Sequence, residues 1–384
     1  MIILSNKKEC CGCSACVAIC PKKCITLQRD DEGFLYANAD AKLCIDCHLC
    51  EQVCPVINRR EPNPPQHTFA AKHLDAEIRL KSSSGGVFSL LAQRTLQNGG
   101  VVYGASYDKD WQLRHIAITS LDLLPQLRGS KYMQSDMDDC YQRVKNDLQA
   151  DREVLFSGTP CQVAGLKNFL RKEYKKLFTV DIACHGVPSP KVWGEYLRSI
   201  NPQQKEITDV NMRDKSTGWQ RYSITIKCKD GNTLVKERAS HNAYMRGFLY
   251  GLYTRPSCYD CPAKAGRSGS DITLCDFWGV RHVTPAIFDK KGVSLLLVNS
   301  QRGMDAIDAL EMERVEASYA EALKYNRCIE HSAAEPPLRE RFWQLFHTTG
   351  ASAIEKVLPK KQNKLLQKVI AFIQRFTQRP NNRQ

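Results

Sequence analysis

Residues 10–55 have the sequence CCGCSACVAICPKKCITLQRDDEGFLYANADAKLCIDCHLCEQVCP, which contains one cysteine pattern twice. In each copy, spacings of two, two and three residues separate four cysteines, and a proline follows the last one. The cysteines of the pattern are Cys10, Cys13, Cys16, Cys20, Cys44, Cys47, Cys50 and Cys54. Each proline ends its run, because the proline ring cannot continue a helix and directs the chain into a turn. The repeat therefore predicts a first domain built around two inorganic centres.

The spacing predicts that these centres are two [4Fe-4S] clusters. In the bacterial ferredoxin arrangement, the first three thiolates of each run bind one cluster and the fourth binds the other. The expected ligand sets are Cys10, Cys13, Cys16 and Cys54 for one cluster, and Cys44, Cys47, Cys50 and Cys20 for the second. The alternatives are a zinc site, which needs four ligands rather than eight in two crossed runs, and a disulfide framework. Cys11 and Cys24 lie outside the pattern and are expected to be packing residues, although a thiol beside a cluster could be redox-active.

The chain is longer than a ferredoxin module requires. Its 384 residues predict two or three domains. The start MIILSNKKE contains no apolar signal region, and no stretch approaches the roughly 18 continuous apolar residues of a membrane span. We therefore expect the 18 cysteines to lie in the reducing cytoplasm, where thiols act as ligands rather than as disulfides.

The formal net charge of +14 does not by itself indicate a nucleic-acid partner. An oxidised [4Fe-4S] core with four thiolates adds about −2, so three such sites would lower the net charge from +14 to about +8. Much of the remaining charge lies near the C-terminus, and no basic stripe is interleaved with aromatic residues. We therefore expect no nucleic-acid partner.

A run of small residues precedes the helix expected over residues 87–97. Free backbone N–H groups and small side chains at a helix start can hold a phosphate or pyrophosphate, whereas a serine-rich helix cap is the alternative. Lys131 is a candidate for a second contact to the anion. The candidate cofactor-binding residues are Ser82, Ser83, Ser84, Gly85, Gly86, Lys131, Gly158 and Thr159.

Two predicted strands each end at a cysteine. The apolar strand 154–158 is followed by Thr159 as N-cap and Pro160 as the first helical residue, which places Cys161 in the first helical turn. The helix dipole and free N–H groups there favour a thiolate. Cys184 follows the next predicted strand in the same way. Because a β-α-β unit joins parallel strands, both thiols are expected at one edge of a parallel sheet.

Cys258 and Cys261 form a CxxCP pair, which is half of a cluster or zinc site and needs two further ligands. The expected partners give a third [4Fe-4S] cluster on Cys161, Cys184, Cys258 and Cys261. One alternative is that Cys275 replaces one of these ligands. Another is that Cys161 is a catalytic thiol while the pair binds zinc.

Six segments, taken in order, resemble the family of coenzyme F420 hydrogenase/dehydrogenase beta subunits. They are KSSSGGVFSLLAQ, GSKYMQSD, FSGTPCQVAGLK, DIACHGVPSPKVW, RPSCYDCPAK and DITLCDFWG. The resemblance covers about residues 1–325 and implies an iron-sulfur flavoprotein that binds FAD and passes electrons between clusters, flavin and a substrate. Some members act on the deazaflavin F420, and relatives reduce chlorophyll-type or bilin-type substrates. The family usually has glycine where this chain has Cys275, which leaves the ligands of the C-terminal cluster open.

Bacterial relatives that are fused to a ferredoxin module, which this chain resembles in this respect, often accompany exopolysaccharide biosynthesis or pyruvyl transfer. The resemblance therefore implies a role of this kind. A flavin also fits the chemistry, because a cubane moves one electron at a time whereas most organic reductions need two. No G-x-G-x-x-G fingerprint follows a strand, so the flavin would be bound in a non-Rossmann manner. We expect a ferredoxin-linked, flavin-dependent oxidoreductase whose catalytic residues and acceptor are unknown. The alternatives are an electron-transfer subunit without a substrate site and a nucleic-acid-binding iron-sulfur protein.

The expected fold class is α/β (α+β). A ferredoxin-like 2[4Fe-4S] domain over residues 1–60 would precede an α/β flavin-binding and iron-sulfur region with parts over 68–148 and 150–325. A basic helical tail over 335–384 would follow, with an apolar face between Leu365 and Phe376. Such a face usually docks on its own protein, and peripheral membrane contact is the alternative. The expected partners are a small-molecule substrate and an electron-donor or acceptor protein, such as ferredoxin or a reductase.

The crossed arrangement makes a direct prediction for Cys20→Ser. This change should damage the cluster held mainly by Cys44, Cys47 and Cys50, because Cys20 supplies its fourth thiolate. Electron paramagnetic resonance (EPR) spectroscopy of the reduced protein measures which cluster is altered. Loss of the cluster bound by the first cysteine run instead would show that the ligation is not crossed.

Overall fold

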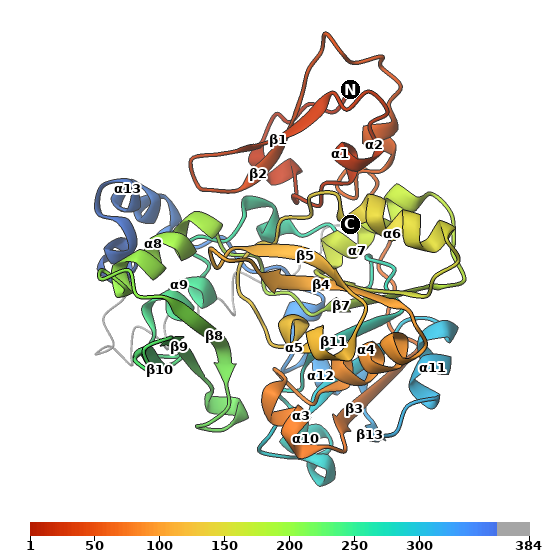
Figure 1. Cartoon of the computed structure of the whole chain (residues 1–384), viewed down its shortest axis with the longest axis vertical. Coiled ribbons are helices and arrows are strands. Elements are labelled where there is room, and N and C mark those ends of the chain that lie inside the picture. Colours follow the sequence, from red (N-terminus) through yellow and green to blue (C-terminus); the bar gives the residue numbers. More distant parts are fainter. Residues whose placement is uncertain (359–384) are drawn as a thin grey trace, which may run out of the picture.

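The computed structural model describes residues 1–358 of the protein. Figure 1 shows a small N-terminal module at one end, a large central sheet with helices around it, and a smaller sheet to one side. No helix within residues 1–358 is long and apolar enough to cross a membrane.

The N-terminal module contains two short helices and one hairpin. Its elements are α1 (Ala15–Ile19), β1 (Ile25–Arg29), β2 (Leu35–Ala39) and α2 (Leu49–Gln52), with β1 antiparallel to β2. Its own core consists largely of cysteines, and the buried members are Ile2, Cys16, Cys24, Ile25, Cys50 and Cys54. So few aliphatic side chains cannot stabilise a module of this size, and metal centres commonly supply the missing stability in domains this small.

The central sheet has eight strands in the order β13-β3-β12-β11-β7-β6-β4-β5. The strands are β3 (His67–His73), β4 (Val101–Tyr107), β5 (Leu113–Ile118), β6 (Val154–Gly158), β7 (Leu177–Ile182), β11 (Ile272–Asp276), β12 (Ser294–Val298) and β13 (Met312–Glu316). The four strands β11, β7, β6 and β4 are parallel to one another, and antiparallel strands flank them. The mixed α/β class predicted from the sequence is therefore confirmed.

The helices of the central part follow the strands they connect. They are α3 (Ala76–Lys81), α4 (Val87–Gln97), α5 (Leu124–Leu127), α6 (Cys140–Gln149), α7 (Pro160–Leu170), α10 (Val280–Val283), α11 (Gln301–Asp308) and α12 (Tyr319–Leu323). The predicted parallel unit is present, because β6 leads into α7 and α7 returns to β7 beside β6. Thr159 and Gln162 form a capping box at the start of α7, so the local sequence fixes the point at which the helix begins.

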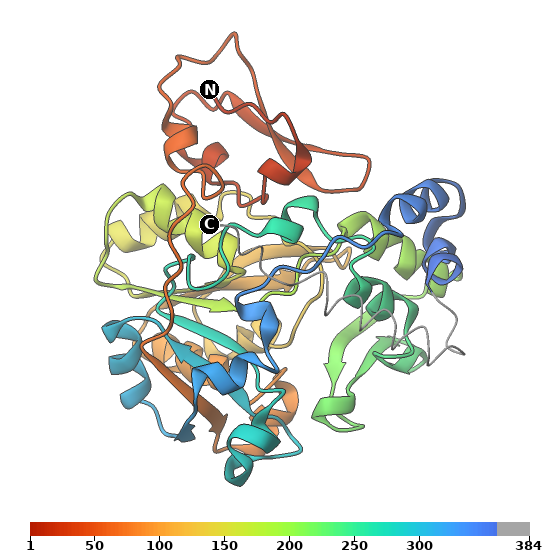
Figure 2. The same cartoon turned by 180° about the vertical axis from the view of Figure 1, so that it is seen from behind.

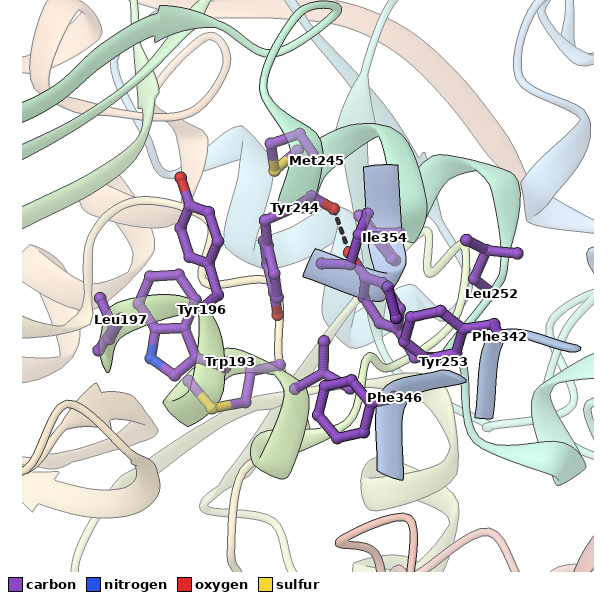
Figure 3. Packing of buried hydrophobic residues seen from close by; sticks show 14 of the residues in the cluster. Trp193, Tyr196, Leu197, Tyr244, Met245, Leu252, Tyr253, Phe342, Phe346 and Ile354 are labelled. Carbon is purple, nitrogen blue, oxygen red and sulfur yellow. Dashed lines mark hydrogen bonds between the residues drawn. The ribbon is translucent and has the colours of Figure 1, made fainter. Parts of the chain in front are cut away.

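A second, smaller sheet lies beside the central one. Its strands are β8 (Ile207–Asp214), β9 (Ser223–Cys228) and β10 (Thr233–Arg238), and its helices are α8 (Pro190–Ile200), α9 (Ala243–Tyr250), α13 (Arg339–Thr349) and α14 (Ala353–Val357). Figure 3 shows the aromatic packing between these helices, with Trp193, Tyr244 and Phe342 contributed by α8, α9 and α13. The predicted tail over 335–384 therefore begins as part of a buried core, and the face from Leu365 to Phe376 lies outside the described residues.

The segment of residues 58–66, which joins the module to β3, is held against the central part. Figure 2 shows it running from the module down to β3. Arg60 donates to Asn168 on α7 at 2.9 Å, and the backbone N–H of Asn63 donates to the carbonyl of Ala265 at 2.9 Å. These contacts fix the module in one position over the central sheet.

A largely buried ion pair also connects the module to the C-terminal helices. Arg339 on α13 donates through Nη1 to Glu32 Oε1 at 2.8 Å, and Nη2 contacts the other carboxylate oxygen. The Arg339 and Glu32 side chains are only 12% and 9% exposed. Removing one partner of a buried pair leaves an uncompensated charge in a dry site.

We therefore predict that Arg339→Met lowers the free energy of unfolding by about 3 kcal/mol, measured by denaturant titration. The double variant Arg339→Met/Glu32→Gln should recover part of this loss, because it also removes the stranded carboxylate. The matched control is Arg198→Met, since Arg198 pairs with Glu195 on the surface of α8. Equal losses for Arg339→Met and the surface control would contradict the prediction.

Candidate cluster sites and cofactor cavity

Two separate cavities in the N-terminal module are lined by the two predicted ligand sets. The lining of one includes Cys10, Cys13, Cys16 and Cys54, together with Cys11. The lining of the other includes Cys20, Cys44, Cys47 and Cys50, together with Cys24. In each cavity the fourth cysteine comes from the opposite run, which is the grouping that crossed ligation requires. The ligand assignments themselves stay predictions.

The chemistry of these donor sets fits a cluster. Burial raises the pKa of Cys16 to about 12, and the nearby Cys10 and Cys54 raise this pKa further. Several thiolates can coexist in such a dry site only when a cationic core compensates their charge. Within residues 1–358, no group of three or more Cys, His, Asp or Glu side chains is placed to hold a single metal ion. A cubane binds four thiolates, one through each of its irons, which matches the two predicted sets of four cysteines.

Cys11 and Cys24, which lie outside the repeat, are both beside predicted ligands. The Sγ atoms of Cys24 and Cys20 are 3.3 Å apart. The Cys11 thiol lies within hydrogen-bonding reach of the thiols of Cys13 and Cys161. Cys11 therefore occupies the boundary between the N-terminal module and the helix that carries Cys161.

The four cysteines predicted to bind a third cluster lie together. Burial raises the pKa of Cys258 to about 12, and the neighbouring Cys261 and Cys161 thiols raise this pKa further. Burial also raises the pKa of Cys184, with contributions from the other three thiols. The chain brings them together because the segment after Cys184 pairs with the segment before Cys258 through a bridge between residues 188 and 254.

Cys275 belongs to a different neighbourhood. Burial raises its pKa, and its next electrostatic neighbours are Cys328, Asp276 and Asp181 rather than the four grouped cysteines. Cys275 and Cys328 both line the large cavity described next. This position favours the set of Cys161, Cys184, Cys258 and Cys261 over the alternative in which Cys275 replaces one of them.

A cavity of about 290 Å³ is lined by residues of the central part of the chain, including the ends of β6, β7 and β11. Of the predicted cofactor-binding residues, its lining includes Ser82, Ser83, Ser84, Gly86, Lys131, Gly158 and Thr159. Gly85 has another role. It packs between β3 and β12, where an added Cβ would collide with the carbonyl oxygen of Ala71, and its N–H donates to Ser294 Oγ at 3.0 Å. The absence of a side chain at Gly85 thus serves packing of the loop on the sheet rather than an approach to a phosphate.

The serine loop, residues 82–86, is fixed by a lysine that the sequence patterns did not indicate. Lys215 Nζ donates to the carbonyl oxygens of Arg79 and Ser84, both at 2.7 Å, and to that of Lys291 at 2.6 Å. Lys215 follows β8 of the smaller sheet. No local pattern in the sequence signals this contact, because it depends on how the two sheets approach each other.

An arginine on β8 contacts residues of the cavity wall. Arg213 forms an ion pair with Asp276 at 2.8 Å and donates to the carbonyl oxygen of Ser83 at 3.3 Å. Its guanidinium also lies 3.9 Å from the centre of the Tyr222 ring and 5.3 Å from that of Trp278. Arg213 therefore positions residues of the cavity wall. Because Asp276 neutralises the guanidinium, Arg213 offers little free charge to a ligand.

Two titratable side chains in the cavity wall are shifted by burial. Burial lowers the pKa of Lys131 to about 7 and that of His115 to about 4. His115 Nδ1 is 2.9 Å from Ser135 Oγ, and its Nε2 is 3.1 Å from the carbonyl oxygen of Ser157. His115 is therefore neutral at physiological pH, whereas Lys131 titrates close to it.

Three consecutive stretches of the chain match known protein families. Residues 9–58 match the model of the 4Fe-4S dicluster domain. Residues 68–140 match that of the N-terminal part of the coenzyme F420 hydrogenase/dehydrogenase beta subunit, and residues 151–322 match that of its C terminus. The first match supports two [4Fe-4S] clusters in the N-terminal module.

Two curated relatives align with most of the chain. One subunit of the F(420)H(2) dehydrogenase of Methanosarcina mazei is 24% identical over 271 residues, which cover 66% of this chain and 71% of the relative. An uncharacterized protein of Methanocaldococcus jannaschii is 23% identical over 328 residues, which cover 74% of this chain and 88% of the relative.

Among solved structures, a chain of the F420-reducing [NiFe] hydrogenase complex from Methanosarcina barkeri matches with a TM-score of 0.46 and 16% identity. The match covers 69% of this chain and 91% of that one. The two consecutive family matches agree with the six ordered segments recognised in the sequence. The protein therefore belongs to the family of coenzyme F420 hydrogenase/dehydrogenase beta subunits and carries a 4Fe-4S dicluster domain at its N-terminal end.

Proposed function

We propose that this oxidoreductase-family protein is an iron-sulfur flavoprotein that passes electrons between a partner protein and a small organic substrate. Electrons would travel through three [4Fe-4S] clusters to FAD. The observation that carries the proposal is the position of Cys161. Its thiol neighbours Cys11 of the N-terminal module on one side, and on the other its Sγ lies 3.2 Å from Oγ1 of Thr159, which lines the cavity.

The contact between α7 and the module supports an electron path between the first and third ligand sets. A Cβ added to Gly165 on α7 would lie 3.0 Å from Cys13 Sγ and 2.8 Å from the Tyr141 hydroxyl. The absence of a side chain at this position allows the helix to approach a predicted cluster ligand directly. The same helix carries Cys161 in its first turn.

The outer face of the module supports exchange of electrons with another protein. Cys47 is exposed, whereas the other three residues of its predicted ligand set are at least partly covered. Leu43 and Ile45 beside it are each 56% exposed. Apolar side chains around an exposed cofactor edge are typical of sites where redox proteins meet briefly. We infer that a ferredoxin or a reductase binds here.

The cavity supports FAD binding. The serine loop leads into the N-terminus of α4, where free N–H groups favour a pyrophosphate, and Lys131 adds a cation on the same side. A bound flavin would supply the exchange between one-electron and two-electron chemistry. The serine loop and Lys131 would hold it, and Lys215 fixes the serine loop in place.

The acceptor is proposed only as a class. Relatives in the family whose names mention coenzyme F420 suggest a deazaflavin, and the ferredoxin fusion suggests a role in exopolysaccharide biosynthesis. The second candidate is an electron-transfer subunit without its own substrate site. Turnover of an added acceptor by the purified chain with reduced ferredoxin distinguishes the two. Reduction of the clusters without turnover of any acceptor would favour the second candidate.

The third cluster predicts a specific result for iron and sulfide analysis of the full-length protein. Cys161→Ala should remove about four iron atoms and matching sulfide per chain, because it breaks one cubane. Cys275→Ala is the matched control, since Cys275 is a comparably buried thiol on the neighbouring strand β11, and it should leave both contents unchanged. Loss of iron in the Cys275 variant alone would reassign the ligand, and one zinc without the extra sulfide would rule out the cluster.

Lys131 predicts a pH dependence of FAD affinity. Burial lowers the Lys131 pKa to about 7, so in the empty cavity the charge is present below this pH and lost above it. A bound pyrophosphate favours the charged form, and affinity should therefore fall as the pH rises from about 6 to about 8. Titration of the flavin-free protein by fluorescence measures this.

Lys131→Met should bind FAD more weakly at low pH and with a flatter pH profile. His115 does not contribute to this pH dependence, because its pKa of about 4 keeps the imidazole neutral between about pH 6 and pH 8. Lys81→Met is the control, since Lys81 is exposed near the same loop and should preserve the profile. An unchanged profile in Lys131→Met would exclude Lys131 as the phosphate contact.

A further inference from the structure

Arg255 is an arginine buried between two predicted cluster sites. It is 0% exposed and lies three residues before Cys258. Within residues 1–358, no carboxylate lies within ion-pair distance of its guanidinium. The other two deeply placed arginines described above, Arg213 and Arg339, both have such a partner.

The hydrogen bonds of Arg255 connect three parts of the chain. Its Nε donates to the Cys10 carbonyl oxygen at 2.8 Å, Nη2 to that of Leu35 at 2.9 Å, and Nη1 to Gln134 Oε1 at 2.9 Å. Nη2 also lies 3.5 Å from Cys10 Sγ. The centre of the Tyr36 ring is 4.2 Å from the guanidinium carbon. All of these partners are neutral except the Cys10 thiol, which becomes anionic as a ligand.

Such a cation needs a counter-charge. Burying an unpaired guanidinium is costly, and neutral hydrogen-bond acceptors offset only part of the cost. The electrostatic neighbours of Arg255 that can become anionic include Cys10, Cys11 and Cys258. Cys10 belongs to the first predicted ligand set and Cys258 to the third, and each occupied site carries about −2. Clusters at these two sites would thus place strong negative charge beside this arginine.

The N-terminal module leaves space for this side chain. Gly12 has a φ of +69°, and an added Cβ would lie 2.7 Å from Arg255 Nη1 and 2.5 Å from Gln134 Nε2. Gly12 lies within the first cysteine run, between Cys10 and Cys13. A side chain at this position would displace the guanidinium from Cys10. The absence of a side chain at Gly12 therefore leaves room for the guanidinium beside the ligand loop.

We propose that Arg255 is the shared counter-ion of the first and third clusters and that it raises the reduction potential of both. The proposal rests on the cluster assignments made under the proposed function. Reduction adds one negative charge to a cluster, and a nearby fixed cation stabilises that charge. Arg255 makes no such contact with the ligand set of the second cluster, which includes Cys47. Arg255 therefore makes the first and third clusters better electron acceptors than the second. Electrons are thus directed from the exposed face of the module towards the cavity.

An EPR-monitored redox titration of the full-length protein tests this proposal. Arg255→Gln removes the charge, and the first cluster should become harder to reduce by at least tenfold in its one-electron equilibrium, which corresponds to about 59 mV. The potential of the third cluster should fall as well. The second cluster is an internal control and should keep its potential. Arg255→Lys retains the charge and should shift the first cluster less than Arg255→Gln does. An unchanged first-cluster potential in Arg255→Gln, or equal shifts in both variants, would overturn the proposal.

Two controls separate the charge from structural damage. Arg60→Gln removes another arginine that joins the module to the central part, through Asn168, and it should change no potential. If Arg255→Gln loses iron, full iron content in Arg255→Lys supports the charge role, and equal loss in both contradicts it. Iron and sulfide in the unmodified protein are measured first. Absence of the third cluster there would refute the proposed function itself, whereas intact clusters with unchanged potentials refute only the role of Arg255.

Discussion

The close approach of α7 to the N-terminal module is the contact on which the rest of the structure depends. Gly165 allows α7 to lie against Cys13, and the first turn of the same helix brings Cys161 beside Cys11. Thr159, the N-cap of this helix, lines the large cavity. One helix thus connects the module, the third group of cysteines and the cavity. Electron transfer requires such short separations, and a rigid helix maintains them better than a loop would.

Charge compensation explains why the protein buries thiols and cations whose burial alone would be unfavourable. The module has few aliphatic core residues, and its buried thiols need a cationic core to be stable as thiolates. Arg255 is buried and pairs with no carboxylate of residues 1–358, and Lys264 donates to the carbonyl oxygens of Cys184 and Cys328. The predicted clusters would balance these cations. They would also offset part of the net charge of +14.

Local sequence patterns predicted much of the fold and of the candidate site. The cysteine spacing predicted the ligands of the module. The strand-to-helix turn before Cys161 could be predicted because the residues that cap the helix are close to it in the sequence. Lys215, Arg213 and Arg255 were missed, since each acts on a distant segment that only the tertiary structure brings near. The packing role of Gly85 was missed for the same reason, because the backbone it packs against comes from β3 and β12. The helices over 339–357 were expected in a tail, yet they complete an aromatic core with α8 and α9.

The central claim is that three clusters and one flavin in this chain form a single electron-transfer system. An anaerobic reductive titration, followed by visible absorbance and by EPR, tests it most directly. The account predicts uptake of about five electrons per chain, one for each cluster and two for the flavin. Uptake of about two electrons, with cluster signals only and no bleaching of a flavin band, would contradict it.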